Sequence, residues 1–403
     1  MKETFVSAER NHIPREINSC EVCGNQNLQK ALDLGRHPLC DDLVPIGSDR
    51  ICKEYPIEIL LCDKCLTAHQ RFQIPREDLF PKHYHYRARM TPNVLTGMLG
   101  LVLRCEERFG SLQDKLVLDI GCNDGSLLDF FKQHGAKTIG VDPTAAALES
   151  KHPTQMAFFE MSVALKILVT DGQPDFITFT NVFAHIEKLA ELLAALKVLI
   201  GPKTVVVIEN HYMGAILDRD QFDTFYHEHP RTYSLESFKY IAKSLGLNLM
   251  GAEFPSRYGG NIRVYLGHGE DFKGGLIDES QFAHKFKEMA THIADWRKTT
   301  RRMIESLVSQ HGKLRAKAFP GRAAILIKLL GINENHISAV YEIKGSIKTG
   351  HYLPGTRIPI LPEADLYTQD LTLPILNLAW HLKQEVRDNL ASHGYTGTVI
   401  DIK

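Results

Sequence analysis

Apolar residues in the middle of the chain alternate between two patterns, one typical of strands and one typical of helices. The short run Leu116 to Ile120 is typical of a buried strand, and the apolar positions that follow it through Phe131 have helical spacing. This pattern continues with three further predicted strands and one predicted helix, over 138–141, 175–180, 204–208 and 189–199. The alternation predicts a parallel, doubly wound α/β sheet.

Different patterns flank this central part. Helical spacing over 90–107 predicts a linking helix before it, and a long helical stretch with a basic, solvated face covers about 279–310 after it. The alternation then resumes in helical or extended segments, over 323–330, 337–341, 375–379, 381–390 and 398–402. We therefore expect three domains, at 1–88, 89–270 and 271–403, the last of them a smaller α/β domain.

Composition narrows the class of protein and of partner. The 403 residues are 44% hydrophobic and 24% charged, which is typical of a soluble globular protein. A net charge of -1 provides no basic excess for nucleic acid, so we expect a small-molecule partner. The N-terminal sequence lacks an apolar signal core, and no long apolar run predicts a membrane span. We expect a cytoplasmic monomer.

Four of the eight cysteines form two CxxC pairs, separated by a turn-rich stretch. Paired thiolates of this spacing hold tetrahedral Zn²⁺, and four of them leave no open coordination position. The sequence therefore predicts a structural zinc site in the N-terminal module, and reduced cysteines without metal are the alternative. The predicted ligands are Cys20, Cys23, Cys62 and Cys65.

A glycine-bearing loop follows the first central strand and opens a helix. Its sequence, Asp-Ile-Gly-Cys-Asn-Asp-Gly over 119–125, lacks the GxGxxG fingerprint of dinucleotide-binding folds, so it favours S-adenosylmethionine. The acidic residue that ends the next strand is placed to accept bonds from the ribose hydroxyls. A nicotinamide-dependent oxidoreductase and a fold without cofactor are the alternatives. The predicted cofactor-binding residues are Asp119, Gly121, Asn123, Asp124, Gly125, Asp142 and Asn181.

Polar clusters follow the later strands. Asn-Val-Phe-Ala-His over 181–185 lies at the strand end where open sheets bind ligands, and Tyr-His-Glu-His over 226–229 offers bases and donors. Acid–base catalysis is the favoured interpretation, with a metal site or a structural role as alternatives. An aromatic segment at 83–87 is a candidate for the mouth of the site. The loop at 348–356 combines a cation, rings and glycines suited to a diphosphate, or is a connecting turn.

The order of these motifs, CxxC, CxxC, GCNDG, NVFAH, YHEH and YLPGT, resembles the sugar C-methyltransferases of deoxysugar biosynthesis along nearly the whole chain. The resemblance implies a class I, Rossmann-like methyltransferase domain between a four-cysteine zinc module and a C-terminal Rossmann-like domain that binds a nucleotide sugar. It implies methyl transfer to C3 of a 4-keto-6-deoxy sugar, usually dTDP-linked, with His229 as the base. The other residues that it implies are Tyr226, Glu228 and His185 in catalysis, and Tyr84, Tyr86, Lys348, Gly350 and Tyr352 in substrate binding.

The chain also departs from the family pattern. Pro-Gly-Arg-Ala-Ala-Ile over 320–325 stands where a GAxAKG-like stretch is usual, Glu342 replaces an aspartate, and Arg-Ala-Arg-Met over 87–90 replaces a serine-rich run. Two alternatives therefore stay open. One is transfer to oxygen or nitrogen of a nucleotide-linked sugar, and the other is a zinc- and cofactor-binding protein without turnover.

Overall fold

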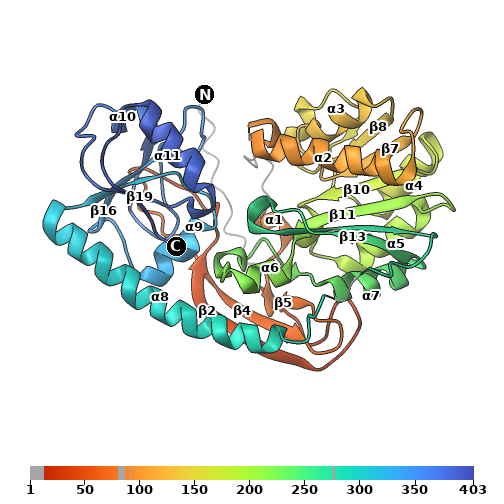
Figure 1. Cartoon of the computed structure of the whole chain (residues 1–403), viewed down its shortest axis with the longest axis horizontal. Coiled ribbons are helices and arrows are strands. Elements are labelled where there is room, and N and C mark those ends of the chain that lie inside the picture. The colour runs from red at the N-terminus through yellow and green to blue at the C-terminus, as the bar shows by residue number, and fades with distance from the viewer. Residues whose placement is uncertain (1–12, 80–86, 91, 275–276) are drawn as a thin grey trace.

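The computed structural model describes residues 13–79, 87–90, 92–274 and 277–403, which form three main sheets (Figure 1). The predicted aromatic residues Tyr84 and Tyr86 lie outside these described residues. No helix within the described ranges is long and apolar enough to cross a membrane.

The N-terminal sheet is antiparallel, and its outermost strand comes from a distant part of the chain. Its order is β12-β5-β4-β2, with β2 (Leu28–Pro38), β4 (Glu54–Cys62), β5 (Ala68–Gln70) and β12 (Arg231–Thr232). Two short ladders accompany it, β1 (Arg15–Glu16) with β6 (Phe72–Gln73) and β3 (Val44–Pro45) with β17 (His351–Tyr352), and α1 (Arg76–Leu79) follows. Because β12 pairs with β5, a segment near residue 230 is held by the cysteine-bearing module.

The central sheet has seven strands, in the order β13-β14-β11-β10-β7-β8-β9. Five strands are parallel: β7 (Leu116–Ile120), β8 (Lys137–Val141), β9 (Thr154–Gln155), β10 (Phe176–Thr180) and β11 (Val205–His211). The hairpin of β13 (Asn248–Glu253) and β14 (Asn261–Gly267) adds antiparallel strands beyond β11. The predicted parallel α/β sheet is thus confirmed.

Helices cover both faces of the central sheet because its buried strands are apolar on both sides. Val117 packs into one core and its neighbour Leu118 into another, as the alternation of side chains along a strand requires. The helices of this part are α2 (Pro92–Phe109), α3 (Ser126–Gln133), α4 (Met161–Thr170), α5 (Leu189–Leu199), α6 (Met213–Asp218) and α7 (Leu235–Leu245). Short 3-10 turns are η1 (Ala88–Met90), η2 (Ala145–Glu149), η3 (Phe183–His185), η4 (Phe222–Thr224) and η5 (Arg257–Gly259).

The C-terminal sheet is fully parallel, in the order β18-β16-β15-β19-β20. Its strands are β15 (Leu314–Lys317), β16 (Ile337–Glu342), β18 (Ile360–Pro362), β19 (Ile375–Asn377) and β20 (Val399–Asp401). Its helical elements are α9 (Ala323–Leu330), α10 (Glu363–Leu366), η6 (Trp380–Leu382) and α11 (Lys383–Ser392). This order places the switch point between β15 and β19, where Rossmann-like sheets open a crevice.

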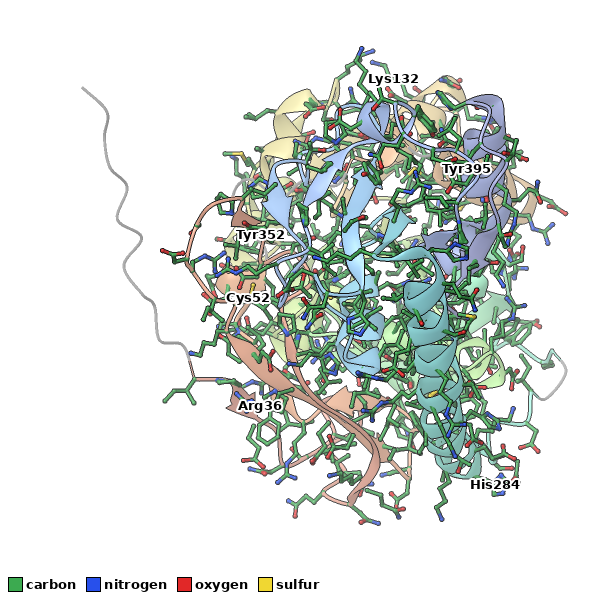
Figure 2. The ribbon with its side chains drawn as sticks, turned by 90° about the vertical axis from the view of Figure 1, so that its left-hand side faces the viewer. Arg36, Cys52, Lys132, His284, Tyr352 and Tyr395 are labelled. Carbon is green, nitrogen blue, oxygen red and sulfur yellow. The ribbon has the colours of Figure 1, made fainter. Side chains whose placement is uncertain are left out.

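The long helix α8 (Phe282–His311) joins the three parts. It contacts α6 of the central part, β2 of the N-terminal sheet, and α9 and β15 of the C-terminal part, and it runs along the lower left of Figure 1. Figure 2 views the molecule from the left-hand side of Figure 1 and shows Tyr352 of β17 near the N-terminal segment that carries Cys52. The β17–β3 ladder joins these two segments, so the N-terminal and C-terminal parts pack directly on each other.

Candidate active site

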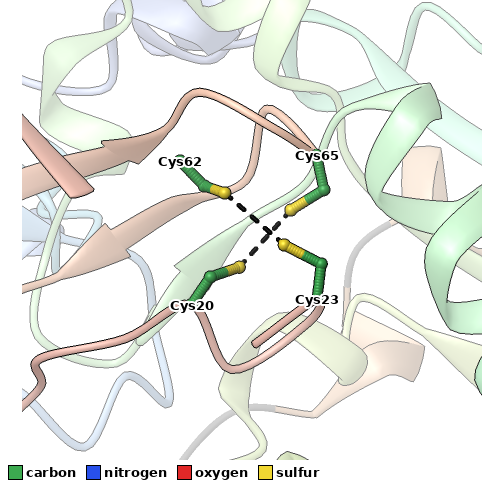
Figure 3. A group of neighbouring side chains, drawn as sticks. All are labelled: Cys20, Cys23, Cys62 and Cys65. Atoms are coloured by element: carbon green, nitrogen blue, oxygen red, sulfur yellow. Dashed lines mark hydrogen bonds between the residues drawn. The ribbon is translucent and has the colours of Figure 1, made fainter. Parts of the chain in front are cut away.

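The four predicted zinc ligands converge. The Sγ atoms of Cys20, Cys23, Cys62 and Cys65 all lie within 4.8 Å of one another (Figure 3). The Cys20–Cys65 and Cys23–Cys62 sulfur separations are 3.4 and 3.6 Å, close to the roughly 3.8 Å edge of a tetrahedron with Zn–S bonds of about 2.3 Å. The residues therefore fit a closed Zn²⁺ site, which stabilises the fold and has no position for a substrate.

The cysteine cluster is tied to the central part of the molecule. The carbonyl oxygen of Cys65 accepts hydrogen bonds from the hydroxyls of Ser234 and Ser237, at 3.0 and 3.2 Å. These two serines form the capping box that begins α7. The side chain of Thr67 also reaches Ser237, at 2.8 Å. Metal binding therefore anchors the start of a helix in the neighbouring sheet system.

A cavity of about 330 Å³ opens at the carboxyl ends of the central parallel strands. Gly121, Asn123, Asp142 and Asn181 line it, as predicted for cofactor-binding residues. Gly121 has φ +75°, and a Cβ there would lie 2.4 Å from Val182 Cγ2, so the close approach of these loops requires glycine. The position matches the crevice in which open α/β sheets bind ligands.

Asp142 is the fixed acidic group of this cavity. Its Oδ2 accepts from the backbone N–H of Asn123 at 2.9 Å, and its Oδ1 accepts from the N–H and hydroxyl of Thr144 at 2.8 and 2.6 Å. A carboxylate has about four acceptor sites, and these three bonds leave one of them for a ribose hydroxyl. The carboxylate and the glycine loop fit S-adenosylmethionine.

The other predicted loop residues do not line the cavity. Asp119 is buried in β7, where Thr178 donates to it at 2.7 Å, and burial raises the pKa of its carboxyl to about 7. Asp124 accepts from Ser126 on one oxygen and from the N–H and Nε of Arg89 on the other, both at 3.0 Å. Gly125, at φ +80°, precedes α3. These three residues therefore support the conformation of the loop and do not face the cavity.

Three histidines and a tyrosine form the far wall of the same cavity. His185, His211, Tyr226 and His229 all line it. The ring centroid of His229 lies 4.6 Å from that of His185, 5.6 Å from that of His211 and 4.4 Å from that of Tyr226. His229 is thus the centre of a cluster that shares one cavity with Asp142.

The hydrogen bonds of His229 define its tautomer. Its Nδ1 lies 3.0 Å from the carbonyl oxygen of Thr224, which accepts only, so Nδ1 must carry the proton. Burial, followed by the nearby His185 and His211, holds the pKa of His229 well below its usual range. A neutral ring with Nδ1 protonated leaves Nε2 with the lone pair of a general base.

The neighbours of His229 are neutral as well. His185 donates from Nδ1 to the carbonyl oxygen of Glu228 at 2.8 Å, and burial lowers its pKa to about 4. Burial, with the nearby Asp41, raises the pKa of the Glu228 carboxyl well above its usual range, and burial does the same for Tyr226. Glu228 itself does not line the cavity; its carboxylate oxygen lies 4.0 Å from His185 Nδ1.

The segment that carries His229 is held from two sides. From the N-terminal sheet, the Gln70 amide donates to the carbonyl oxygen of Tyr226 at 3.2 Å, and His227 Nε2 reaches the carbonyl oxygen of Tyr55 at 3.2 Å. From the C-terminal part, Arg322 Nη1 donates to the hydroxyl of Thr224 at 3.2 Å. The N-terminal and C-terminal parts therefore both contribute to the position of His229.

The predicted C-terminal substrate residues do not line this cavity. Lys348 Nζ donates to the carbonyl oxygen of Phe319 at 2.8 Å, and the Tyr352 hydroxyl accepts from the N–H of Gly47 at 3.2 Å. Gly350 precedes β17 at φ +86°. Their part in substrate binding stays a prediction.

Two residues of the cavity wall were missed at the level of sequence. Asn210 and His211 end β11, which is longer than the predicted strand at 204–208. The rule that ligands bind at the carboxyl ends of parallel strands would have identified them, had the polar end of the strand been recognised.

Comparisons with known proteins cover nearly the whole chain. A family model described as "Putative zinc binding domain" matches residues 20–80, one described as "Methyltransferase domain" matches 90–250, and one described as "C-methyltransferase C-terminal domain" matches 257–400. The C-methyltransferase NovU of Streptomyces niveus is 28% identical over 399 residues, covering 94% of this chain and 93% of its own. A ubiquinone biosynthesis O-methyltransferase of Acinetobacter baumannii is 27% identical over 104 residues, 24% of this chain and 44% of its own.

Solved structures also resemble part of the chain. The magnesium protoporphyrin IX methyltransferase of Synechocystis PCC 6803 with bound S-adenosylhomocysteine is 14% identical, has a TM-score of 0.35, and covers 43% of this chain and 83% of its own. The PH0226 protein of Pyrococcus horikoshii OT3 is 12% identical with a TM-score of 0.35, covering 48% and 97%.

The family matches follow one another in the order of the three sheet systems. The metal-binding cysteines, the cofactor loop and the C-terminal part each fall within the corresponding match. The full-length relative is named as a C-methyltransferase. The chain is therefore an S-adenosylmethionine-dependent methyltransferase with structural zinc, and it is similar over nearly its whole length to a C-methyltransferase.

Proposed function

We propose that the enzyme methylates C3 of a dTDP-linked 4-keto-6-deoxy sugar, with His229 as the base that generates an enolate. The observation that carries this proposal is the geometry of His229, a buried neutral imidazole whose Nδ1 is engaged and which shares a cavity with Asp142. A proton next to a ketone is acidic enough for such a base when a donor stabilises the enolate oxygen.

In this reaction the C3–H bond breaks, its proton goes to His229 Nε2, and its electron pair moves toward the carbonyl. The Thr224 carbonyl oxygen stabilises the imidazolium that results, because it accepts from Nδ1. S-adenosylmethionine supplies an electrophilic methyl group on a sulfonium. Tyr226, which keeps its hydroxyl proton, and the neutral His185 complete the wall around the acceptor.

The test combines product analysis with one substitution. The enzyme is incubated with methyl-labelled S-adenosylmethionine and a panel of dTDP-, GDP- and CDP-linked 4-keto-6-deoxy sugars, and the position of the new methyl is read by NMR. We expect it on C3 of a dTDP-linked sugar. The His229→Asn variant should bind S-adenosylhomocysteine normally, yet lose both methyl transfer and exchange of the C3 proton with deuterated solvent.

The control is His284→Asn, which changes a largely exposed histidine on α8 and should leave both rates unchanged. Wild-type exchange and transfer in His229→Asn would remove this residue from the mechanism. A methyl group found on oxygen or nitrogen of the product would refute the carbon-nucleophile reaction itself.

A further inference from the structure

Asn210 has an unusual environment for a buried polar residue. It lies near the carboxyl end of β11 and is 1% exposed. Within the described parts of the chain, neither Oδ1 nor Nδ2 of its side chain has a hydrogen-bond partner. Exchanging the positions of Oδ1 and Nδ2 would not create a hydrogen bond, so the assigned orientation of the amide does not explain the missing partners. Buried side-chain amides are nearly always paired, and exceptions mark bound water, ligands or catalytic roles.

The neighbours of Asn210 are already engaged. The Glu209 carboxylate binds the guanidinium groups of Arg257 and Arg263. The amide of Asn261 donates to Asn181 Oδ1 at 3.2 Å and to Glu209 Oε1 at 3.1 Å. The Glu209 carboxylate and the amide nitrogen of Asn261 are thus already engaged, and the Asn210 amide is available to a group that enters the cavity.

Asn210 belongs to the same cavity wall as the proposed base. It lines the cavity and immediately precedes His211, whose ring centroid is 5.6 Å from that of His229. Asn181, its counterpart after the adjacent parallel strand β10, also lines the cavity. An acceptor bound beside His229 therefore shares this cavity with Asn210.

The proposed reaction needs such a group. As the C–H electron pair moves toward the carbonyl, negative charge develops on the carbonyl oxygen, and a fixed donor there lowers the barrier. An amide N–H can donate without giving up its proton, so its contribution does not depend on pH. Its Oδ1 can accept from a hydroxyl next to the ketone, so one amide matches an α-hydroxyketone.

We propose that Asn210 binds the ketone of the acceptor, with Nδ2 donating to the carbonyl oxygen on which the enolate charge develops and Oδ1 accepting from an adjacent hydroxyl. This inference rests on the proposed function, because it assumes an acceptor with a ketone next to the methylated carbon. Asn210 thereby selects keto sugars over reduced sugars.

Two variants test the inference. Asn210→Leu removes both hydrogen-bonding atoms at similar size, and Asn210→Asp keeps the shape but replaces the donor by an acceptor. The assay measures C3 proton exchange by NMR in deuterated water, with S-adenosylhomocysteine and dTDP-4-keto-6-deoxyglucose, and methyl transfer to the same sugar. We expect both variants to lose about 10²- to 10³-fold in both rates, with an unchanged dissociation constant for S-adenosylhomocysteine.

Stability separates this role from a structural one. Replacing an unpaired buried amide by leucine should leave the melting temperature unchanged or raise it, whereas loss of a structural partner would lower it. Asn335→Leu, in the exposed turn before β16, is the matched control and should leave both rates and melting unchanged.

Wild-type exchange in either variant would overturn the donor role, and so would a marked loss of melting temperature or of S-adenosylhomocysteine affinity in Asn210→Leu. The proposed function fails in a different way, when the wild-type enzyme itself neither exchanges nor methylates a keto sugar at carbon. Wild-type activity with unaffected Asn210 variants would refute only the role of Asn210.

Discussion

Removing the charge of Arg322 should loosen the contact between the C-terminal part and the segment that carries the base. Arg322 lies in the turn before α9, with Nε 3.3 Å from Asp223 Oδ2 and Nη1 donating to Thr224 at 3.2 Å. Its guanidinium also lies 5.2 Å from the ring centroid of Trp380, whose indole N–H donates to Asp223 at 2.8 Å. In Arg322→Met, Asp223 keeps the Trp380 donor but loses its ion-pair partner.

The expected loss of stability follows from the burial of the Arg322–Asp223 pair. The side chain of Asp223 is 0% exposed and that of Arg322 is 11% exposed, so the carboxylate left behind cannot be hydrated. Breaking a buried pair in this way costs about 3–5 kcal/mol. The double variant Arg322→Met, Asp223→Asn removes both charges and keeps an acceptor for the Trp380 N–H, so we expect it to recover most of that loss. Lys239→Met, which breaks a partly exposed pair with Glu236 on α7, should cost at most about 0.5 kcal/mol.

The Arg322→Met substitution should also change the pKa of His229. Its Nδ1 is bonded to the carbonyl oxygen of Thr224, and the positive charge of Arg322 helps to lower its pKa. Without that charge the pKa of His229 rises toward its usual value. Because the base acts in its neutral form, activity is lost as pH falls through this pKa, so the acid limb of the kcat profile should move to higher pH.

Hydrogen exchange at the amides of α9 measures local opening of this contact, and methyl transfer followed against pH measures its effect on the base. The reasoning is wrong if the double variant is as destabilised as Arg322→Met. It is also wrong if the acid limb of Arg322→Met coincides with that of the wild type.

Three further results are expected. Asp142→Ala should weaken S-adenosylhomocysteine binding at least roughly tenfold in calorimetry, because a charge-assisted hydrogen bond to the ribose is lost; an unchanged affinity would place the cofactor elsewhere. Elemental analysis should find one zinc per chain, lost in the Cys62→Ser, Cys65→Ser variant, whereas less than half an equivalent would contradict the site. Burial lowers the pKa of His227 to about 4 and that of His381 to about 3. As pH falls below about 6.5, these two histidines therefore take up protons in the unfolded state while they remain neutral in the folded state. The unfolding free energy should therefore decrease by about 2 kcal/mol per histidine between pH 7 and pH 5, and the decrease should be smaller in His227→Gln. An unfolding free energy that stays constant from pH 7 to 5 would refute this.

Local sequence patterns predicted those elements in which apolar residues recur at one regular spacing. The first central strand was predicted over 116–120 and is observed as Leu116–Ile120, and the long helix predicted over 279–310 is observed as Phe282–His311. In both, periodicity alone reports burial, because apolar side chains recur at the spacing of the element. The CxxC pairs were equally informative, since their ligand spacing is a property of a short segment.

The polar end of β11 was missed for a physical reason. The predicted strand stops at residue 208 because Glu209, Asn210 and His211 break the apolar run. Glu209 is nevertheless fully buried, compensated by two arginines from the hairpin side of the sheet, Arg257 and Arg263. Their positions in space cannot be read from periodicity. A strand end made of polar residues with distant partners is therefore invisible to local patterns, although it lines the catalytic cavity.

The role of the zinc module follows from pairings that the sequence also hides. A closed site of four cysteines offers no coordination position for chemistry, so its effect on catalysis must be mechanical. The pairing of β5 with β12 places His69 opposite Arg231, and the N–H of Gln70 donates to the carbonyl oxygen of Pro230 at 2.9 Å. Pro230 directly follows His229. The strand that begins six residues after Cys62 thus fixes the backbone next to His229, the proposed base, so we expect loss of the metal to impair methyl transfer through the position of His229.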